Sequence, residues 1–387
     1  MTVSIHLPRI LRIGAGASAE LAQTLATLGL SRPLIVTDGY LLRSGRAERL
    51  ATSLKKAGIA SRVFSETVPE PTVGCVEAAR DVLLAGDHDC VVGFGGGSPI
   101  DSAKAIAVLS RHGGEMSDYR TPFVQDTPGL PIIAVPTTAG TGSEATRFTV
   151  ITDDLRGEKM LCAGLAYLPI AALVDYELTL TMPPRLTADT GLDALTHGIE
   201  AYVSRRANPF SDTFALAALR SIAPSLRRVW ADPMDREARA RMMLGATQAG
   251  IAFSNSSVAL VHGMSRPIGA HFHVPHGLSN AMLLPVITTY SMPAAVGRYA
   301  DCARAMGLAD GGDGDEAAAE RLVGELARLN ADLAVPTPRT YGIDERRWNE
   351  LIPLMAEQAL ASGSPANNPV VPTADEVVSL YRRTWNA

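Results

Sequence analysis

The first 175 residues repeat one pattern, in which a short apolar run is followed by a longer stretch with apolar residues at helical spacing. Runs such as PLIVTD at 33–38 and CVVGFGG at 90–96 do not alternate polar with apolar residues. Strands of this kind are buried on both faces, as in a parallel sheet that helices cover on both sides. The pattern therefore predicts a doubly wound α/β fold. The predicted strands are 9–13, 33–38, 61–66, 90–96, 130–138 and 171–175, and the predicted helices between them include 18–29, 45–58 and 72–86.

The pattern changes after Met182-Pro183-Pro184. Strand-like runs almost disappear, and stretches with apolar residues at helical spacing follow one another instead. We therefore predict two domains, an α/β domain over residues 1–184 and an all-α domain over residues 185–387. The predicted helices of the second domain are 187–204, 210–228, 235–253, 256–270, 294–306, 315–330 and 345–360.

Charge, hydropathy and cysteine spacing exclude several classes of protein. With a net charge of -5, the chain offers no basic stripe for a nucleic acid. No run reaches the ~18 apolar residues that a membrane-spanning helix needs, and the start MTVSIHLPRILRIGAG lacks the regions of a signal peptide. The four cysteines are far apart and form no C-x-x-C pair, which argues against a zinc ribbon or a disulfide scaffold. We expect a soluble cytoplasmic protein with no nucleic-acid or membrane partner.

Two glycine-rich loops are candidates for binding a dinucleotide. The first, 14–19, follows a predicted strand and matches G-x-G-x-x-A, and Asp38 ends the next strand about twenty residues later. The alternative for this loop is a tight turn between a strand and a helix. A carboxylate at Asp38 would accept hydrogen bonds from an adenosine ribose and repel a 2′-phosphate, which favours NAD over NADP. The alternative for Asp38 is an ordinary Asp-Gly turn with Gly39.

The second loop, 93–101, follows a buried strand and opens a helix. We expect Ser98 at the N-cap, Pro99 at the first helical position and Asp101 at the third, which would make a capping box. Three consecutive glycines let backbone N–H groups approach a pyrophosphate, and the helix dipole favours its negative charge. We therefore prefer this loop over the first for phosphate. A further segment, 136–144, offers threonine and serine hydroxyls for ribose or phosphate, unless it is only a capped turn.

A candidate metal site combines two distant segments. In the predicted helix 187–204, Asp193 and His197 are four residues apart, so both lie on one face, about 6 Å apart along the axis. Glu200 is a reserve ligand or a partner of a ligand. His262 and His276 are 14 residues apart, and an unbroken helix would separate them by ~21 Å, too far for one ion.

The chain must therefore bend between His262 and His276, and we expect Pro267, Gly269 and Pro275 to make the bend. One carboxylate and three imidazoles form a mixed oxygen and nitrogen set suited to iron(II) or zinc. The alternatives are an ordinary pair on a helix surface and two loop histidines.

Together these motifs resemble the iron-dependent (group III) alcohol dehydrogenase family. The resemblance implies an N-terminal dinucleotide-binding α/β domain, an all-α metal-binding domain, NAD, Fe²⁺ or Zn²⁺, and a homodimer. It favours the second glycine-rich loop over the first. The stretches that carry it are GGGSPIDSAKA (95–105), PTTAGTGSEAT (136–146), VDYELTLTMPPRLTADTGLDALTHGIEAYVS (174–204) and LVHGMSRPIGAHFHVPHGLSNAMLLP (260–285).

The resemblance also implies roles for individual residues. The metal ligands are expected to be Asp193, His197, His262 and His276. The substrate is expected near Lys159 and Phe253. The cofactor is expected against Asp38, Gly95, Gly96, Gly97, Ser98, Asp101, Thr137, Thr138, Thr141 and Leu178.

The sequence departs from the family at three places. Arg266 stands where many members have a histidine that helps proton movement, so the proton would leave through His271, His273 or water. If Arg266 points to the substrate, its guanidinium would bind a carboxylate or phosphonate. The alternative is a salt bridge or a contact with a helix end. Tyr176 replaces a common proline, and residues 368–370 read Asn-Pro-Val in place of Asn-Pro-Arg.

We therefore expect reversible hydride transfer between an alcohol and NAD, with the metal acting as a Lewis acid on the substrate oxygen. One alternative is a maleylacetate reductase or hydroxy-acid dehydrogenase, which acts on a carboxylated substrate. A second is a non-redox cyclase of the dehydroquinate-synthase type. An alternative of another class is a non-catalytic regulator that binds a nucleotide or a metal.

Overall fold

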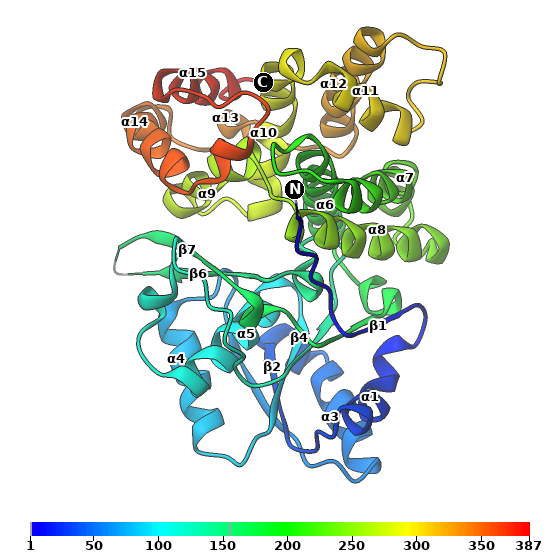
Figure 1. The fold of residues 1–387 in the computed structure, drawn as a ribbon, viewed down its shortest axis with the longest axis vertical. Helices are drawn as coiled ribbons and strands as arrows, with labels where there is room; N and C mark the ends of the chain where they lie inside the picture. Colours follow the sequence, from blue (N-terminus) through cyan, green and yellow to red (C-terminus); the bar gives the residue numbers. More distant parts are fainter. Residues whose placement is uncertain (1, 155) are drawn as a thin grey trace. The chain divides into compact units, whose positions relative to one another are not determined.

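The computed structural model of the chain describes residues 2–154 and 156–387. Its contacts define two compact units, one over residues 6–181 and one that joins residues 182–387 to the N-terminal segment up to Ile5. The first unit contains the sheets and the second is helical (Figure 1). No helix in the described parts of the chain is long and apolar enough to cross a membrane.

The α/β unit is built on a parallel sheet of six strands. Apart from Asp38, every residue of its four central strands is buried. This confirms the parallel sheet that the apolar, non-alternating runs predict. The order across the sheet is β1 (Ile10–Ile13), β8 (Ala171–Val174), β5 (Ile132–Pro136), β4 (Cys90–Gly95), β2 (Pro33–Asp38) and β3 (Arg62–Thr67).

Neighbouring residues of the central strands face different helices. Leu34 and Val36 of β2 pack in one core with α4 (Val73–Leu84) and α5 (Gly97–His112). Ile35 packs in a second core with α1 (Leu21–Leu28) and α3 (Arg46–Lys56). Successive side chains of a strand point to opposite faces of a sheet. Helices therefore cover both faces, which is the doubly wound arrangement that the sequence predicts.

An antiparallel hairpin of β6 (Phe148–Asp153) and β7 (Glu158–Ala163) lies outside the predicted elements. In β6, the buried residues Thr149 and Ile151 alternate with partly exposed ones. A half-exposed strand of this kind has no continuous apolar run. It therefore lacks the signal that predicts the buried strands.

The second unit is all-α, as predicted, but three of its helices, α10, α13 and α15, lie outside the predicted segments. α10 is buried on almost all sides and so has no apolar stripe of helical period. α15 carries a capping box at Thr373 and Glu376, a signal that would have located it. The helices are α6 (Pro184–Val203), α7 (Pro209–Ala231), α8 (Arg236–Ser254), α9 (Leu260–Phe272), α10 (His276–Ser291), α11 (Val296–Ala305), α12 (Asp315–Asp332), α13 (Pro338–Tyr341), α14 (Glu345–Ala361) and α15 (Ala374–Thr384).

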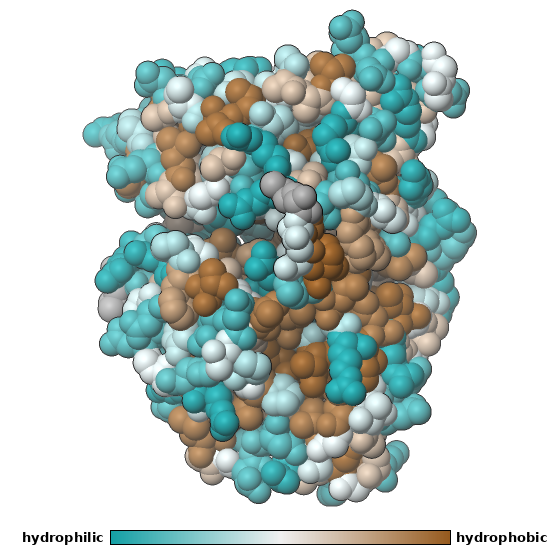
Figure 2. Space-filling view, viewed as in Figure 1, coloured by the Kyte–Doolittle hydropathy of each residue, from teal (hydrophilic) through white to brown (hydrophobic). Residues whose placement is uncertain are grey.

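Strand β1 lies at one edge of the six-stranded sheet and pairs with β8. Its residue Ile13 and the preceding Leu7 are 46% and 38% exposed. Figure 2 shows a broad group of apolar residues on the visible face of the α/β unit. At this edge of the sheet, no further strand among the described residues pairs with β1, and apolar side chains are exposed.

Candidate metal centre and nucleotide loop

Helix α6 carries the first part of the candidate metal centre. Asp193 and His197 are only 2% and 4% exposed, so they are not a surface pair. Nε2 of His197 lies 3.9 Å from Oδ1 of Asp193. The His197 ring stacks on the rings of Phe253 from α8 and His262 from α9, with centroids 4.3 and 4.4 Å apart. These contacts hold the imidazole of His197 in a defined orientation.

The break between α9 and α10 lies later than the sequence predicts. Pro267 and Gly269 lie inside α9, so the prediction that they bend the chain is wrong. Pro267 removes one backbone hydrogen bond, but both residues are buried and the surrounding packing keeps the helix intact. The chain turns instead at His273, whose φ of 54° is left-handed, and Pro275 precedes the first residue of α10.

Three potential ligand atoms converge in the helical unit. Nε2 of His262 and Nε2 of His276 lie 3.4 and 3.8 Å from Oδ1 of Asp193. The three atoms all lie within 4.8 Å of one another, and His197 adjoins them through Asp193. The side chain of His276 is 36% exposed, against 3% for Asp193. The group is therefore closed on the α6 side and open on the His276 side.

The amide of Asn280 lies among these three atoms. Its Nδ2 is 2.7 Å from Oδ1 of Asp193, 3.1 Å from Nε2 of His262 and 3.3 Å from Nε2 of His276. One N–H₂ group thus faces three acceptors, as a cation would with shorter bonds. Carboxylate oxygen and imidazole nitrogen are suitable ligands for iron(II) or zinc, so the residues fit a divalent metal. Asn280 is absent from the predicted site, although it lies one helical turn after His276.

Glu200 of α6 supports His262. Its Oε2 lies 2.6 Å from Nδ1 of His262, and its Oε1 accepts the N–H of Val261 at 2.6 Å. A carboxylate at Nδ1 fixes the imidazole tautomer and leaves Nε2 for a metal. Of the two roles expected for Glu200, the structure supports the partner of a ligand.

The carboxyl group of Asp193 is ionised at neutral pH. Burial raises the pKa of Asp193, but the charges of His197 and His276 and the contact with His262 outweigh burial and hold the pKa well below its usual value. A buried carboxylate is costly unless a positive group compensates it. Asp193 is therefore available as an ionised carboxylate ligand, the form that metal binding requires.

The two remaining predicted residues of α9 differ in their distance from His262. His271 follows His262 by nine residues, about 13.5 Å along a helix, and its Nε2 contacts Oε1 of Gln358 at 2.8 Å. The structure does not bring His271 to the three ligand atoms. Arg266 is one turn from His262, and its Nη1 donates to the hydroxyl of Ser364 at 3.0 Å.

In the α/β unit, the carboxyl ends of β2 and β4 meet at a topological switch point. The chain leaves β2 toward β3 on one side and leaves β4 toward β5 on the other. Ligands of open α/β sheets bind beyond the strand ends at such a point. Asp38 ends β2 and Gly95 ends β4, so these two predicted cofactor residues lie at neighbouring strand ends. Oδ1 of Asp38 also caps α2 (Gly39–Arg43) by accepting the N–H of Leu41 at 2.8 Å.

Helix α5 begins at Gly97 with Gly96 as its N-cap. The predicted capping box, with Ser98 at the N-cap and Asp101 third, is therefore wrong. The first N–H groups of a helix have no partner within it, and those of Gly97 and Ser98 have no acceptor in the described parts of the chain. Two N–H groups thus remain at the positive end of the helix dipole, as an anion site requires.

Ser98 and Asp101 have other partners, which is why they do not cap α5. The half-buried carboxylate of Asp101 accepts the hydroxyl of Ser143 at 2.5 Å and the N–H of Val150 at 2.9 Å. The hydroxyl of Ser98 accepts the N–H of Glu70 at 3.2 Å. Both side chains therefore bind segments that are distant in the sequence.

The glycines of this second loop pack against threonines that follow β5. A Cβ on Gly97 would lie 2.9 Å from Cγ2 of Thr141, and a Cβ on Gly96 would lie 3.2 Å from Cγ2 of Thr138. A larger residue at either position would push the threonine away. The structure thus brings the two predicted cofactor segments together.

The first glycine-rich loop already holds an anion from the chain itself. The N–H groups of Gly16 and Ser18 donate to the carboxylate of Asp175 at 3.2 and 3.3 Å, and the Ser18 hydroxyl donates to it at 2.6 Å. Asp175 directly follows β8, the neighbour of β1. A pyrophosphate would have to displace this carboxylate.

Lys159 and Leu178 complete the predicted residues of the α/β unit. Lys159 on β7 forms an ion pair with Glu70, and its side chain is 6% exposed. Because Glu70 also contacts Ser98, this pair links the hairpin to the second loop. Leu178 is half-buried and packs against the core that contains α1 and α3.

Sequence models of known families match both parts of the chain. The iron-containing alcohol dehydrogenase model matches residues 8–176, and the model for the C-terminal part of the Fe-containing alcohol dehydrogenase family matches residues 187–385. The chain belongs to the iron-containing alcohol dehydrogenase family. As a member of this family, it is a metal-dependent, nicotinamide-linked oxidoreductase that acts on alcohols and aldehydes. This sets aside the alternatives of a non-redox cyclase and a non-catalytic regulator.

Several dehydrogenases and reductases are similar to the chain along nearly its full length. It is 40% identical to long-chain-alcohol dehydrogenase 1 of Geobacillus thermodenitrificans, over 90% of this chain and 88% of that protein. It is 36% identical to the lactaldehyde reductase of Escherichia coli (strain K12), over 96% of this chain and 97% of that protein. It superposes on a crystal structure of 1,3-propanediol oxidoreductase with a TM-score of 0.94 at 33% identity, over 99% of this chain and 100% of that chain.

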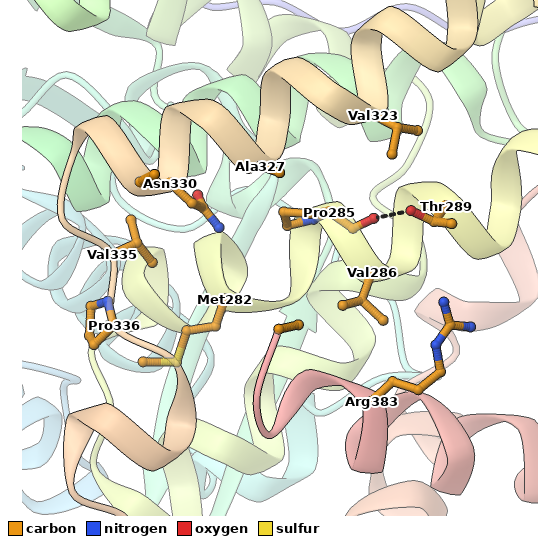
Figure 3. Close-up of a pocket in the computed structure, with 12 residues that line it drawn as sticks. Met282, Pro285, Val286, Thr289, Val323, Ala327, Asn330, Val335, Pro336 and Arg383 are labelled. Atoms are coloured by element: carbon orange, nitrogen blue, oxygen red, sulfur yellow. Dashed lines mark hydrogen bonds between the residues drawn. The ribbon is translucent and has the colours of Figure 1, made fainter.

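A pocket of about 400 Å³ lies in the helical unit of this alcohol dehydrogenase (Figure 3). Its lining comes mainly from apolar residues of α10 and α12, with Arg383 from α15. The hydroxyl of Thr289 donates a hydrogen bond to the carbonyl oxygen of Pro285 at 2.8 Å. The lining includes none of the three potential ligand atoms, so this pocket is not the metal centre.

Proposed function

We propose that the protein is an NAD-linked, iron-dependent dehydrogenase that interconverts an alcohol and its aldehyde. Asp193, His197, His262 and His276 hold Fe²⁺, and Zn²⁺ is an alternative occupant of the same ligands. The observation that carries the proposal is the convergence of three ligand atoms on the Asn280 amide. Relatives named for a long-chain alcohol, for lactaldehyde and for 1,3-propanediol support an alcohol or aldehyde substrate.

The residues around the ligands have separate tasks. When bound, the metal supplies Lewis-acid polarisation of the substrate oxygen. Glu200 orients His262 through Nδ1. Phe253 covers one face of His197 and excludes water from it. The exposed edge of His276 is the side from which the substrate oxygen approaches.

We further propose that NAD binds at the second glycine-rich loop. The N–H groups of Gly97 and Ser98 receive the pyrophosphate at the positive end of α5. The hydroxyls of Thr138 and Thr141 adjoin the same loop. Asp38, at the switch point, receives the ribose hydroxyls and repels a 2′-phosphate, which favours NAD over NADP. Equal turnover with NADPH and NADH would contradict the role of Asp38.

The test compares two buried aspartates of α6. Asp193→Ala removes a proposed ligand, whereas Asp189→Asn, one turn earlier, disturbs an ion pair with Arg185. Loss of a mere supporting partner already lowers metal affinity 10- to 100-fold, so we expect Asp193→Ala to lower Fe²⁺ affinity by at least about 100-fold. Metal content after anaerobic loading and NADH formation from 1,2-propanediol are measured for both variants. Asp189→Asn should bind the metal, and full metal content and activity in Asp193→Ala would overturn the proposal.

We also propose that the enzyme is a cytoplasmic homodimer. The open edge of β1 and the exposed Leu7 and Ile13 support pairing with a second copy, since an unpaired strand edge is a template for association. The four free cysteines support a reducing compartment. Light scattering of the purified protein decides the oligomeric state.

A further inference from the structure

Arg266 is a half-buried cation with few partners. A guanidinium has five N–H donors, and in the described parts of the chain the one hydrogen bond from Arg266 goes to the neutral hydroxyl of Ser364. Arg266 forms no ion pair with a carboxylate among the described residues. The salt bridge that the sequence leaves open as an alternative is therefore absent from the described residues.

Arg185 shows how a structural arginine of the same unit is held. It pairs with Asp189 and donates to the carbonyl groups of Leu333 and Ala334 at 2.8 and 3.0 Å. Glu200 is the carboxylate whose charge raises the pKa of Arg266. Its two oxygens are hydrogen-bonded to His262 and Val261 instead. Arg266 thus has donors that the protein does not use.

The unused donors of Arg266 lie about one helical turn from His262, a proposed metal ligand. Arg266 follows His262 by four residues on α9, so both lie on one face, about 6 Å apart along the helix axis. Side chains of a helix lean toward its N-terminus, which directs Arg266 toward the turn of His262. On the other flank, Pro365 packs against Gly263, next to Ser364.

Arg266 remains charged at neutral pH. Burial lowers the pKa of Arg266 to about 10, against the effect of Glu200. A charged, planar fork binds carboxylates and related oxyanions through two parallel hydrogen bonds. A neutral alcohol has no anionic group to which the guanidinium could donate two parallel hydrogen bonds.

We propose that Arg266 binds an anionic group of the substrate. The substrate is then a short aldehyde or alcohol that carries a carboxylate, sulfonate or phosphonate, with the anion within about one helical turn of the reacting oxygen. This inference rests on the proposed function. In the direction of reduction, the aldehyde carbon gains the hydride of NADH and its oxygen gains a proton from solvent, which yields the alcohol and NAD⁺.

The experiment compares matched aldehydes with NADH. Succinic semialdehyde is paired with butanal, and sulfoacetaldehyde and phosphonoacetaldehyde are each paired with propanal. We expect the wild type to prefer at least one anionic aldehyde in kcat/KM, and the preferred one identifies the anion. Because hydrogen bonds to charged groups are strong, Arg266→Gln should lower the anionic-to-neutral ratio about 10- to 100-fold, and Arg266→Lys should lower it less.

Two control variants separate a contact of Arg266 with the substrate from a general effect of charge or packing. Arg346→Gln makes the same charge change at an exposed site that pairs with Glu350, and it should leave the ratio unchanged. Ser364→Ala removes the protein's own acceptor for Arg266 and should keep the preference. A ratio that Arg266→Gln leaves unchanged would refute the inference.

A measurement on the wild type makes the test independent of folding of the variants. Acetate, methanesulfonate and methylphosphonate should inhibit competitively against the preferred aldehyde, and inhibition should weaken with added salt. If the wild type reduces butanal without preferring any anionic aldehyde and without inhibition by these anions, the inference fails and the proposed function stands. If it reduces none of the aldehydes, the proposed function itself fails.

Discussion

The two glycine-rich loops of the α/β unit look alike in sequence and differ in what their N–H groups contact. Each follows a strand of the same parallel sheet and leads into a helical segment. In the first loop, Gly16 and Ser18 donate to the carboxylate of Asp175. In the second, the N–H groups of Gly97 and Ser98 have no acceptor among the described residues.

The neighbouring strand explains this difference. β1 pairs with β8, and the residue after β8 is Asp175, so a carboxylate fills the first loop. β4 pairs with β5, and β5 is followed by neutral threonines, among them Thr138 and Thr141. A glycine motif therefore shows only that some group lies close to the backbone of the loop. The partner is set by the adjacent strand, which can be far away in the sequence, as Asp175 is from Gly16.

The largest contrast is expected from one alanine in each loop. A Cβ at Gly95, where φ is 155°, would lie 2.5 Å from Cγ of Pro99, whose ring cannot move aside. Gly14 has a φ of 140° and nothing within 4 Å of an added Cβ. We expect Gly95→Ala to lower the free energy of unfolding by about 3 kcal/mol, because it overpacks a rigid site. Gly14→Ala should cost about 1 kcal/mol through backbone strain alone.

Urea unfolding followed by circular dichroism measures both variants. Tryptophan fluorescence is unsuitable, because Trp230, Trp348 and Trp385 all lie in the helical unit. NAD affinity is measured in the same samples and should fall only for Gly95→Ala. Equal effects of the two substitutions would remove the distinction between the loops.

The next contrast removes the carboxylate that fills the first loop. Asp175→Ala leaves three N–H groups, those of Gly16, Ser18 and Glu177, and the Ser18 hydroxyl without their acceptor. We expect a loss of about 2 kcal/mol in the free energy of unfolding, the usual size for losing hydrogen bonds to a charged group. The dissociation constant of NAD should change by no more than about twofold, which corresponds to ~0.4 kcal/mol of binding free energy. A large change in NAD affinity would instead assign the cofactor to the first loop.

The sequence predicts the parallel sheet because buried strands have a local signature, an unbroken apolar run such as PLIVTD. The pairing of Asp193 with His197 is also local, since helical geometry fixes residues four apart. Likewise, the distance between His262 and His276 requires a break in the chain. These features depend on neighbouring residues alone.

Other features depend on tertiary packing, and local sequence signals do not predict them correctly. Pro267 is a strong local signal for a bend, yet the buried packing of α9 overrides it and the turn occurs at His273. Asp101 fits a capping box by spacing, but Ser143 and Val150 bind it instead. Asn280 lies one helical turn after His276, but its contacts with Asp193 and His262 come from tertiary packing.

The smallest contrast concerns a charge buried beside the second loop. Lys104 of α5 is 0% exposed and donates to the carbonyl of Phe148 at 2.7 Å and to the carbonyl and hydroxyl of Thr146 at 3.1 and 3.0 Å. Burial lowers the pKa of Lys104 to about 8, against the effects of Asp101 and Glu144. In the first loop, the described partners of the Asp175 carboxylate are neutral N–H and O–H groups, not a buried cation.

This charge makes stability depend on pH in a direction that can be checked. Below about pH 8, Lys104 is protonated in both the folded and the unfolded chain. Between about pH 8 and the usual lysine pKa near 10.5, the side chain is protonated in the unfolded chain but mostly neutral in the folded one. The free energy of unfolding of the wild type should therefore rise relative to Lys104→Met as pH rises, by about 1 kcal/mol between pH ~7 and ~9. Lys55→Met, at an exposed position, should show no such trend against the wild type. If the difference in the free energy of unfolding between the wild type and Lys104→Met does not change with pH, Lys104 keeps its proton in the folded protein. A permanently charged lysine would then be buried beside the second loop.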